Sequence, residues 1–486
     1  MSEVELAQGR PAAAEKILNE VAATSGSDRL EALSRLANLN LSRGQHEQAL
    51  KQVESLLKAD PASDKGHLLK GRILLVQGDF AGAVAELRTV IGHNPAEISA
   101  HILLAQAHLA AGQKGLAMDA LNSAIKLNPE AAEALLARAR LLAAQARYGE
   151  ALADVDKALA QNSANAEARG LKADILLAGG DKSGATALYR ELVRAVPREA
   201  ANYRKLSRLL FAQGAKAEAV KLLESGLTAN PDDSGLLADL VEVQLASGQI
   251  ASAEQLCRGR SNKGEASASL LLAEVMRAKR DLKGCEQALE LASRQAPQWS
   301  RPYELLAGLY LAQQQPAKAV AKLKAGLGAN PASLELTLAL GALQEQRGDF
   351  AGARSTYEQG LKRHANVWQL LNNLAFLLAA ESDDRADWNK ASELAERARV
   401  LAPSEPAVLD TLGWLSYRRG DLAGAKLNLD KAIKLSPRDA EINYHLACLL
   451  KRDGQTKSAK AHLKTALASG RNFHGRKQAE SLLKQI

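Results

Sequence analysis

The residues with the most obvious capacity for chemistry are three cysteines and nine histidines, and their spacing favours neither a metal site nor a nucleophile. The cysteines form no C-x-x-C pair, so we expect neither a disulfide framework nor a zinc knuckle. His101 and His108 share one predicted helix, but no second ligand pair faces them. Phosphate-binding loops, zinc-protease motifs and nucleophile elbows are also missing. The sequence therefore predicts a protein that is not an enzyme and uses no cofactor or metal ion.

Aromatic residues near the C-terminus indicate a different chemistry, which is noncovalent binding. Aromatic side chains make up only 3% of the chain, yet Trp414 and Tyr417 lie three residues apart on one predicted helix. Rings supply apolar contact area, and amide, carboxylate and imidazole groups supply directional hydrogen bonds. The predicted pocket consists of Asn372, Asn373, Phe376, Asp410, Trp414, Tyr417, Tyr444, His445 and Lys451. We expect Trp414 to be its anchor. The alternative is that Trp414 and Phe376 only pack against neighbouring helices.

Basic residues gather at the same end of the chain. From Ala447 to Ile486 there are nine Lys or Arg residues and two acidic ones, a balance of +7, whereas the whole chain carries +8. The predicted basic cap consists of Lys457, Lys460, Lys464, Arg471, Arg476 and Lys477. We expect it to attach to an acidic surface, such as anionic lipid, acidic protein or acidic glycan, in a manner that salt weakens.

These side chains must be positioned by elements that repeat. Proline recurs every 34 residues at Pro61, Pro95 and Pro129, and a period of this length is typical of helix-turn-helix solenoids. Aligned on this period, the thirteen predicted units start at residues 30, 64, 98, 132, 166, 200, 234, 266, 300, 334, 368, 406 and 440. The predicted organisation is a partial unit with a truncated first helix over 1–29, the thirteen units over 30–473, and a capping helix over 474–486.

Two columns of the repeat predict how the helices pack. The eighth position is small in twelve units of thirteen, as at Gly413, and the twentieth is alanine in all units except one, which has Cys285. Two helices approach closely only where both surfaces lack bulk, since the side chains at the contact set the distance between the axes. The columns therefore predict an all-α chain in which the two helices of each unit cross at these positions.

The composition limits the remaining classes. A chain of 486 residues exceeds the size of one compact core, and 47% hydrophobic with 24% charged residues is typical of a folded protein. No apolar run is long enough to predict a transmembrane helix, and no leader-like segment follows Met1. Nucleic acid is not an expected partner, because the net charge is modest and acidic residues are interspersed.

The repeat resembles the tetratricopeptide repeat (TPR) family. The resemblance rests on LLKGRILLVQGDFAGAVAELRTVIGHNP and TLGWLSYRRGDLAGAKLNLDKAIKLSP, and it covers about the whole chain. The family's aromatic at the fourth position is present only as Tyr203 and Tyr303, and its carboxylate clamp has no match. The resemblance implies a right-handed superhelix whose first helices line a concave groove. The predicted pocket would then lie in that groove and bind a peptide or protein segment.

The C-terminal arm, which contains NNLAFLLAA and AERARVLAPSEPAVLDTLGWLSYRRGDLAGA, looks like that of long bacterial TPR proteins. Some of these accompany exopolysaccharide synthesis and protein sorting in the cell envelope, so the resemblance favours a periplasmic or envelope location over a cytoplasmic one. The chain also begins inside a predicted helix, as a fragment of a longer protein would. Our main prediction is a non-enzymatic interaction scaffold in a bacterial multiprotein assembly. The alternatives are a glycan-binding accessory subunit of an exopolysaccharide synthesis or export system, and a regulatory arm cut from a larger protein.

Overall fold

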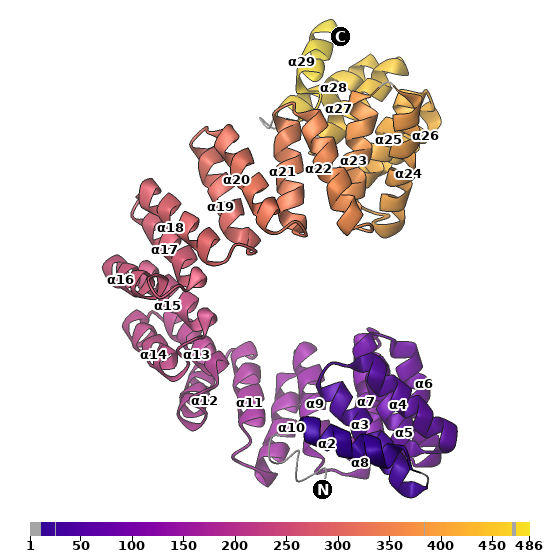
Figure 1. The fold of residues 1–486 in the computed structure, drawn as a ribbon, viewed down its shortest axis with the longest axis vertical. Helices are drawn as coiled ribbons and strands as arrows, with labels where there is room; N and C mark the ends of the chain where they lie inside the picture. The colour runs from indigo at the N-terminus through magenta and orange to yellow at the C-terminus, as the bar shows by residue number, and fades with distance from the viewer. Residues whose placement is uncertain (1–10, 25, 383, 469–472) are drawn as a thin grey trace. The chain divides into compact units, whose positions relative to one another are not determined.

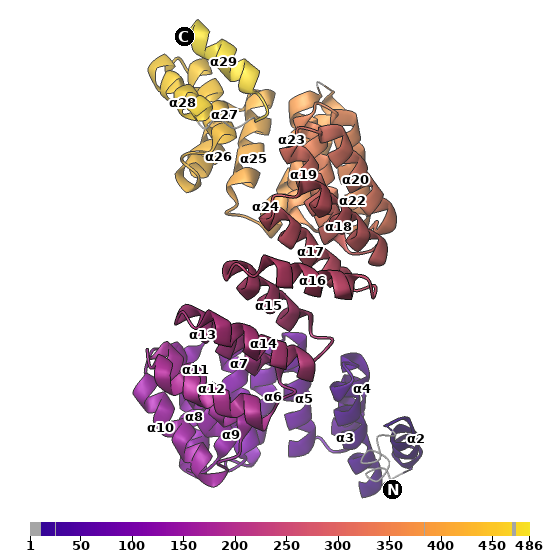
Figure 2. The same ribbon diagram turned by 90° about the vertical axis from the view of Figure 1, so that its left-hand side faces the viewer.

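Helices joined by short turns make up the structure. The computed structural model describes residues 11–24, 26–382, 384–468 and 473–486, and these ranges contain no strand. Figure 1 shows the helices following one another in chain order, and Figure 2 shows the same succession after a quarter turn. The predicted fold class, an all-α solenoid of helix pairs, is confirmed.

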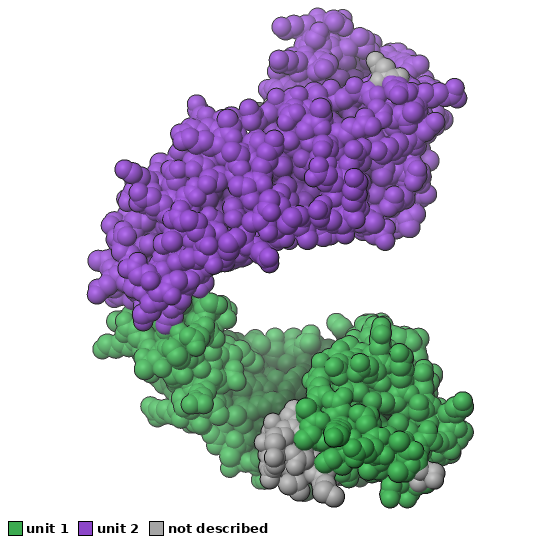
Figure 3. Space-filling view, viewed as in Figure 1, with its two compact units in different colours: residues 1–243 green, residues 244–486 purple. Residues whose placement is uncertain are grey.

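The chain forms two compact units, residues 1–243 and residues 244–486 (Figure 3). The helices that begin in unit 1 are α2 (Pro11–Ala22), α3 (Ser27–Ser42), α4 (His46–Ala59), α5 (Asp64–Gln77), α6 (Phe80–His93), α7 (Ile98–Ala110), α8 (Lys114–Leu127), α9 (Ala132–Ala144), α10 (Tyr148–Gln161), α11 (Ala166–Ala178), α12 (Lys182–Ala195), α13 (Ala200–Ala212), α14 (Lys216–Ala229) and α15 (Ser234–Ala246). The truncated helix predicted at the start of the chain falls in residues 1–10, outside the described residues.

Unit 2 continues the same alternation. Its helices are α16 (Ile250–Ser261), α17 (Ala266–Ala278), α18 (Leu282–Gln295), α19 (Ser300–Ala312), α20 (Pro316–Ala329), α21 (Leu334–Gln346), α22 (Phe350–Arg363), α23 (Trp368–Glu381), α24 (Arg385–Leu401), α25 (Pro406–Arg419), α26 (Leu422–Leu435), α27 (Ala440–Arg452), α28 (Thr456–Ala468) and α29 (Arg476–Gln485). The first helices of successive pairs also touch, so that α25 contacts both α23 and α27.

Small residues let the two helices of a pair meet. The alanines of the twentieth column, from Ala49 to Ala459, are all fully buried. Gly413 of α25 faces α26, and a Cβ added there would lie 2.6 Å from Cγ of Leu429. A larger side chain would therefore push the helices apart, which explains the small column that the sequence shows.

An aspartate and a glycine shape the turn inside many pairs. Gly420 ends α25 with a φ of +84°, a conformation that glycine adopts without steric cost. Asp421 then precedes α26, and its side chain accepts a hydrogen bond from the backbone N–H of Gly424 at 2.9 Å. This N-cap satisfies one of the free amides of the first helical turn. The same Asp-x-x-Gly cap precedes α6, α12, α18 and α22.

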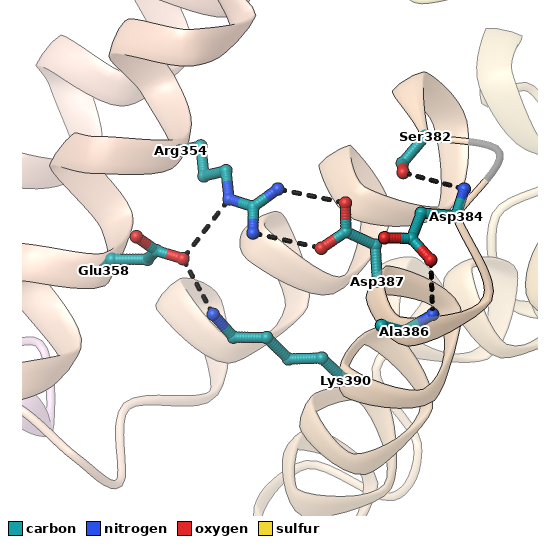
Figure 4. A network of polar contacts seen from close by, with 7 residues as sticks. All are labelled: Arg354, Glu358, Ser382, Asp384, Ala386, Asp387 and Lys390. Carbon is teal, nitrogen blue, oxygen red and sulfur yellow. Dashed lines mark hydrogen bonds and ion pairs between the residues drawn. The ribbon is translucent and has the colours of Figure 1, made fainter.

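The longest helix of unit 2 carries the insertion that breaks the period. α24 has 17 residues, and a polar network joins its first turns to α22 (Figure 4). Arg354 donates two hydrogen bonds to Asp387, both at 3.0 Å, and Lys390 pairs with Glu358 at 2.7 Å. The added residues therefore lengthen the second helix of one pair and leave the succession of pairs intact.

Candidate functional site

A cavity of about 850 Å³ lies in unit 2, and we call it the C-terminal pocket. Side chains of α21, α23, α25 and α27 line it, and these are the first helices of four successive pairs. Further parts of the wall come from Phe350 and Tyr357 of α22, from turn residues next to these helices, and from residues 473–478, which lead into and begin α29. Because neighbouring first helices lie side by side, residues about one repeat apart in sequence converge on one space.

Acidic side chains dominate the wall. The carboxylates that line the pocket are Glu345, Glu381, Glu405, Asp410, Asp439 and Glu441. Several have a defined partner: the Tyr357 hydroxyl donates to Glu345 at 2.5 Å, and Nε2 of His474 lies 3.1 Å from Glu381. Asp439 caps α27 by accepting from two backbone N–H groups at 3.0 Å each. The cationic side chains of the wall are Arg476 and Lys477, so the acidic groups outnumber them.

Burial raises the pKa of three of these carboxyl groups, those of Glu345, Glu381 and Glu441. The pKa of Glu345 is raised to about 7: burial is the main cause and the nearby Glu381 charge adds to it, while the hydrogen bond from the Tyr357 hydroxyl acts against them. Burial likewise raises the pKa of Glu441 well above the ordinary 4.5, helped by the charges of Asp410, Asp439 and Glu345. At neutral pH the pocket therefore resists further negative charge.

Some polar atoms at the site have no hydrogen-bond partner among the described residues. They are Oδ1 of Asn372, Oε1 of Glu441, Nε1 of Trp414 and Nε2 of His445. Asn372 and Glu441 line the pocket, and the Asn372 residue is only 6% exposed. Buried polar groups in native proteins are nearly always paired, and an unpaired one costs stability. The Asn372 oxygen can only accept, and the Glu441 oxygen accepts when its carboxyl group is ionised, so neither oxygen has a donor among the described residues.

A stack of rings stands beside the pocket. Trp414 lies between two rings, 4.2 Å from the centroid of His445 and 5.1 Å from that of Tyr417. Nδ1 of His445 donates to both oxygens of Asp410 at 2.9 Å, which fixes the imidazole against the tryptophan. Trp414 is 9% exposed and belongs to the hydrophobic core of unit 2. The prediction that it stands open in the groove is wrong, because neighbouring rings cover it.

The C-terminal segment covers part of this aromatic surface. The Phe473 ring lies 6.0 Å from that of Tyr444, centroid to centroid. Gly475, at a φ of +85°, comes so close that an added Cβ would lie 2.4 Å from Cε1 of Tyr444. Glycine is therefore required there for both its conformation and its size. The chain itself fills the place where the sequence predicted an exposed binding surface.

Family models match along much of the chain. Two models, both described as tetratricopeptide repeat, match residues 68–132, 102–167 and 136–200, and residues 5–73, 210–264 and 310–374, respectively. The chain belongs to the tetratricopeptide repeat family. Its helix pairs, small columns and glycine turns are thus TPR units.

The TPR chain is similar to segments of two curated proteins. It is 32% identical over 161 residues to the TPR repeat-containing protein PA4667 of Pseudomonas aeruginosa, covering 33% of this chain and 27% of that protein. It is 30% identical over 148 residues to cellulose synthase operon protein C of Pseudomonas fluorescens, covering 29% and 12%, respectively. The chain therefore spans about a quarter and about an eighth of these relatives.

Among solved structures, the APC/C hetero-tetramer Cut9–Hcn1 is similar to this chain. The sequence identity is 16% and the TM-score is 0.39, with 99% of this chain and 94% of that chain covered. A thermophilic TPR protein of Thermus thermophilus shares 22% identity at a TM-score of 0.34. The latter match covers 37% of this chain and 99% of that one.

The structure divides the nine residues of the predicted pocket. Those that line the C-terminal pocket are Asn372, Asn373, Phe376 and Asp410. The ring stack contains Trp414, Tyr417, Tyr444 and His445. Lys451 is exposed and donates to Oε1 of Gln485 at 3.5 Å, so it contacts α29 and does not line the pocket. Whether this site binds a partner stays a prediction.

The basic cap is also divided. Arg476 and Lys477 line the pocket, whereas Lys457, Lys460 and Lys464 are exposed on α28. Lys460 donates to the backbone oxygen of Ile486 at 2.6 Å, which ties α28 to the C-terminus. The remaining member, Arg471, lies outside the described residues.

Several wall residues were missed from the sequence. Glu405 and Asp439 sit just before α25 and α27, where helix caps are expected, and nothing in the sequence alone marks them as pocket residues. Glu441 occupies the second position of its repeat, which the TPR pattern places on the inner stripe, so that signal was available. His474 and Phe473 belong to a segment whose path the repeat does not predict.

The described residues show neither a membrane-spanning helix nor a cluster of metal ligands. They contain no helix that is both long and apolar enough for a bilayer crossing. They also contain no group of three or more His, Cys, Asp or Glu side chains arranged to hold a metal ion.

Proposed function

We propose that this TPR chain is a non-enzymatic interaction scaffold that binds a segment of a partner protein in the C-terminal pocket, as one member of a bacterial multiprotein assembly. TPR repeats support a role in protein interaction in general. The observation that supports this particular site is a cavity of about 850 Å³ lined by unpaired acceptors and by side chains of four successive first helices. A pocket of this size accommodates a few residues of an extended segment.

The ring stack favours a peptide over a glycan as the ligand. Sugar binding would need open aromatic faces, and Trp414, Tyr417 and Tyr444 are the rings that could supply them. Trp414 and Tyr444 are 9% and 7% exposed, respectively, and the half-buried Tyr417 stacks on Trp414. The pocket instead offers carboxylate and amide oxygens, which suit a polypeptide with donor groups.

A selection with a random heptapeptide library, displayed on phage, tests the proposal. The full chain is compared with Ala407→Trp, which places a bulky ring on the exposed pocket wall at the start of α25. The matched control is Ala423→Trp, at the corresponding position of α26, exposed and away from the pocket. We expect peptides that bind the wild-type chain and the control but bind Ala407→Trp at least tenfold more weakly, on the order of 1.4 kcal/mol. Selected peptides that bind Ala407→Trp as tightly as the wild-type chain, or failure to select any peptide, would refute the site.

A further inference from the structure

We infer that the C-terminal pocket receives a basic side chain of the bound segment, and that an arginine guanidinium fits it best. The inference rests on the proposed function and names the chemistry of its ligand. It depends on the charge of the wall, on two buried acceptors without donors and on the rings next to them.

The acidic side chains of the pocket wall favour a cationic ligand group. Six carboxylates, on or just before the four first helices of the wall, line the cavity, whereas the wall's own cations lie on the C-terminal segment. Arg476 is engaged with Glu480 at 3.1 Å, and Lys477 is exposed. A recess lined mainly by one sign of charge concentrates the opposite charge. An acidic or phosphorylated segment would add to the repulsion that already exists among the carboxylates.

The unpaired acceptors select a donor-rich group. Oδ1 of Asn372 and Oε1 of Glu441 come from α23 and α27, line the cavity and have no partner in the described part of the chain. Asn372 is more than nine-tenths buried, so its oxygen is shielded from bulk solvent. A guanidinium carries five N–H donors and no acceptor, and an ammonium carries three. Either group would satisfy these oxygens, while a neutral apolar side chain would leave them unpaired.

The rings favour arginine over lysine. Phe376 and His474 both line the cavity, with ring centroids 5.4 Å apart at 89°, and His474 also lies 5.9 Å from Phe350. A guanidinium is planar and weakly hydrated, so it stacks on such rings while it donates to carboxylates in its own plane. The compact, strongly hydrated ammonium of lysine gains less from these surfaces.

Defined peptides test the inference. The probes are heptapeptides that the full chain selects and that Ala407→Trp fails to bind, each synthesised again with its arginine replaced by lysine or by glutamine. We expect arginine in most of them, a loss of about thirtyfold in affinity for Arg→Gln and a smaller loss for Arg→Lys. The variant Glu441→Gln keeps the size of that side chain and removes its charge. When the peptides are measured with Glu441→Gln, the loss of affinity caused by Arg→Gln should be smaller than with the wild-type chain, because the peptide arginine and Glu441 interact in the complex.

The outcomes separate the two proposals. Pocket-dependent peptides without a basic residue, or an Arg→Gln change without effect, would overturn the inference and leave the binding site in place. Failure to find any pocket-dependent peptide would overturn the proposed function and the inference with it. An undiminished Arg→Gln loss in Glu441→Gln and equally in Glu381→Gln would overturn the assignment of the cation to these carboxylates.

Discussion

Two carboxyl groups of the C-terminal pocket, those of Glu345 and Glu441, are costly to ionise in the folded chain. Glu441 has an oxygen without a partner among the described residues, and its pKa is raised well above 4.5 by burial and by neighbouring acids. Glu345 shares this environment, with a pKa of about 7. An enzyme uses such groups to transfer protons, whereas at a binding site they favour a cationic ligand.

The raised pKa values of Glu345 and Glu441 predict how the stability of unit 2 depends on pH. Between the ordinary pKa of 4.5 and the raised values, the folded chain holds more protons than the unfolded chain. The free energy of unfolding therefore falls as pH rises from about 5 to about 8. Glu441→Gln replaces the carboxyl group with an amide that does not titrate, so we expect it to raise Tm at pH 8 by about 2–4 °C, on the order of 1 kcal/mol, and to change it little at pH 5.

Thermal unfolding of both proteins at the two pH values checks this expectation. His474 should instead make the folded chain more stable as pH rises, because burial and then the His445 charge lower its pKa below 6.5. Comparison of wild type with Glu441→Gln removes that contribution, since His474 is present in both. The other groups of the wall, including Asp410, Asp439 and Arg476, are also common to both proteins. A lower Tm for Glu441→Gln at pH 8 would contradict the account.

At the scale of helices, the ring stack joins α25 to α27. Trp414 of α25 stacks on His445 of α27, and Nδ1 of His445 donates a hydrogen bond to Asp410 of α25. The contact combines buried apolar area with a buried hydrogen bond, so it holds two first helices at a fixed spacing. The pocket needs this spacing, because its acceptors come from separate helices.

Trp414→Ala should therefore destabilise the C-terminal repeats. Truncation of a buried tryptophan typically costs about 3–5 kcal/mol, and Leu412→Ala, also in α25, should cost about 2–5 kcal/mol. Thermal unfolding followed by circular dichroism, with limited proteolysis to locate the change, measures both variants. Retention of the native melting profile in Trp414→Ala would show that the ring is not part of the core.

The sequence repeat predicts the helices well, but it predicts only part of the pocket wall. The small columns act within one pair of helices, so a period of 34 residues was enough to predict the all-α fold and contacts such as Gly413 against Leu429. Asn372, Asn373, Phe376 and Asp410 were found because they follow the same period. The path of residues 473–478 does not follow it, and this segment covers the rings that would otherwise be exposed.

At the scale of the whole molecule, two compact units of similar length are built from the same TPR pair. In a repeat protein, each pair contacts mainly its neighbours, so a change in one region leaves distant pairs largely intact. Unit 2 differs by its insertion, its ring stack and its C-terminal segment, and it contains the pocket that we assign to ligand binding. The proposed ligand should therefore act on one end of the array.

Amide hydrogen exchange of the full chain, with and without a heptapeptide from the display selection, tests this central claim most directly. Exchange reports local opening of the backbone, and a bound segment slows it where it makes contact. We predict slower exchange in α21, α23, α25 and α27 and in residues 473–478, with unit 1 unchanged. Protection confined to unit 1, or to α24 and α26, would contradict the claim that the C-terminal pocket is the binding site.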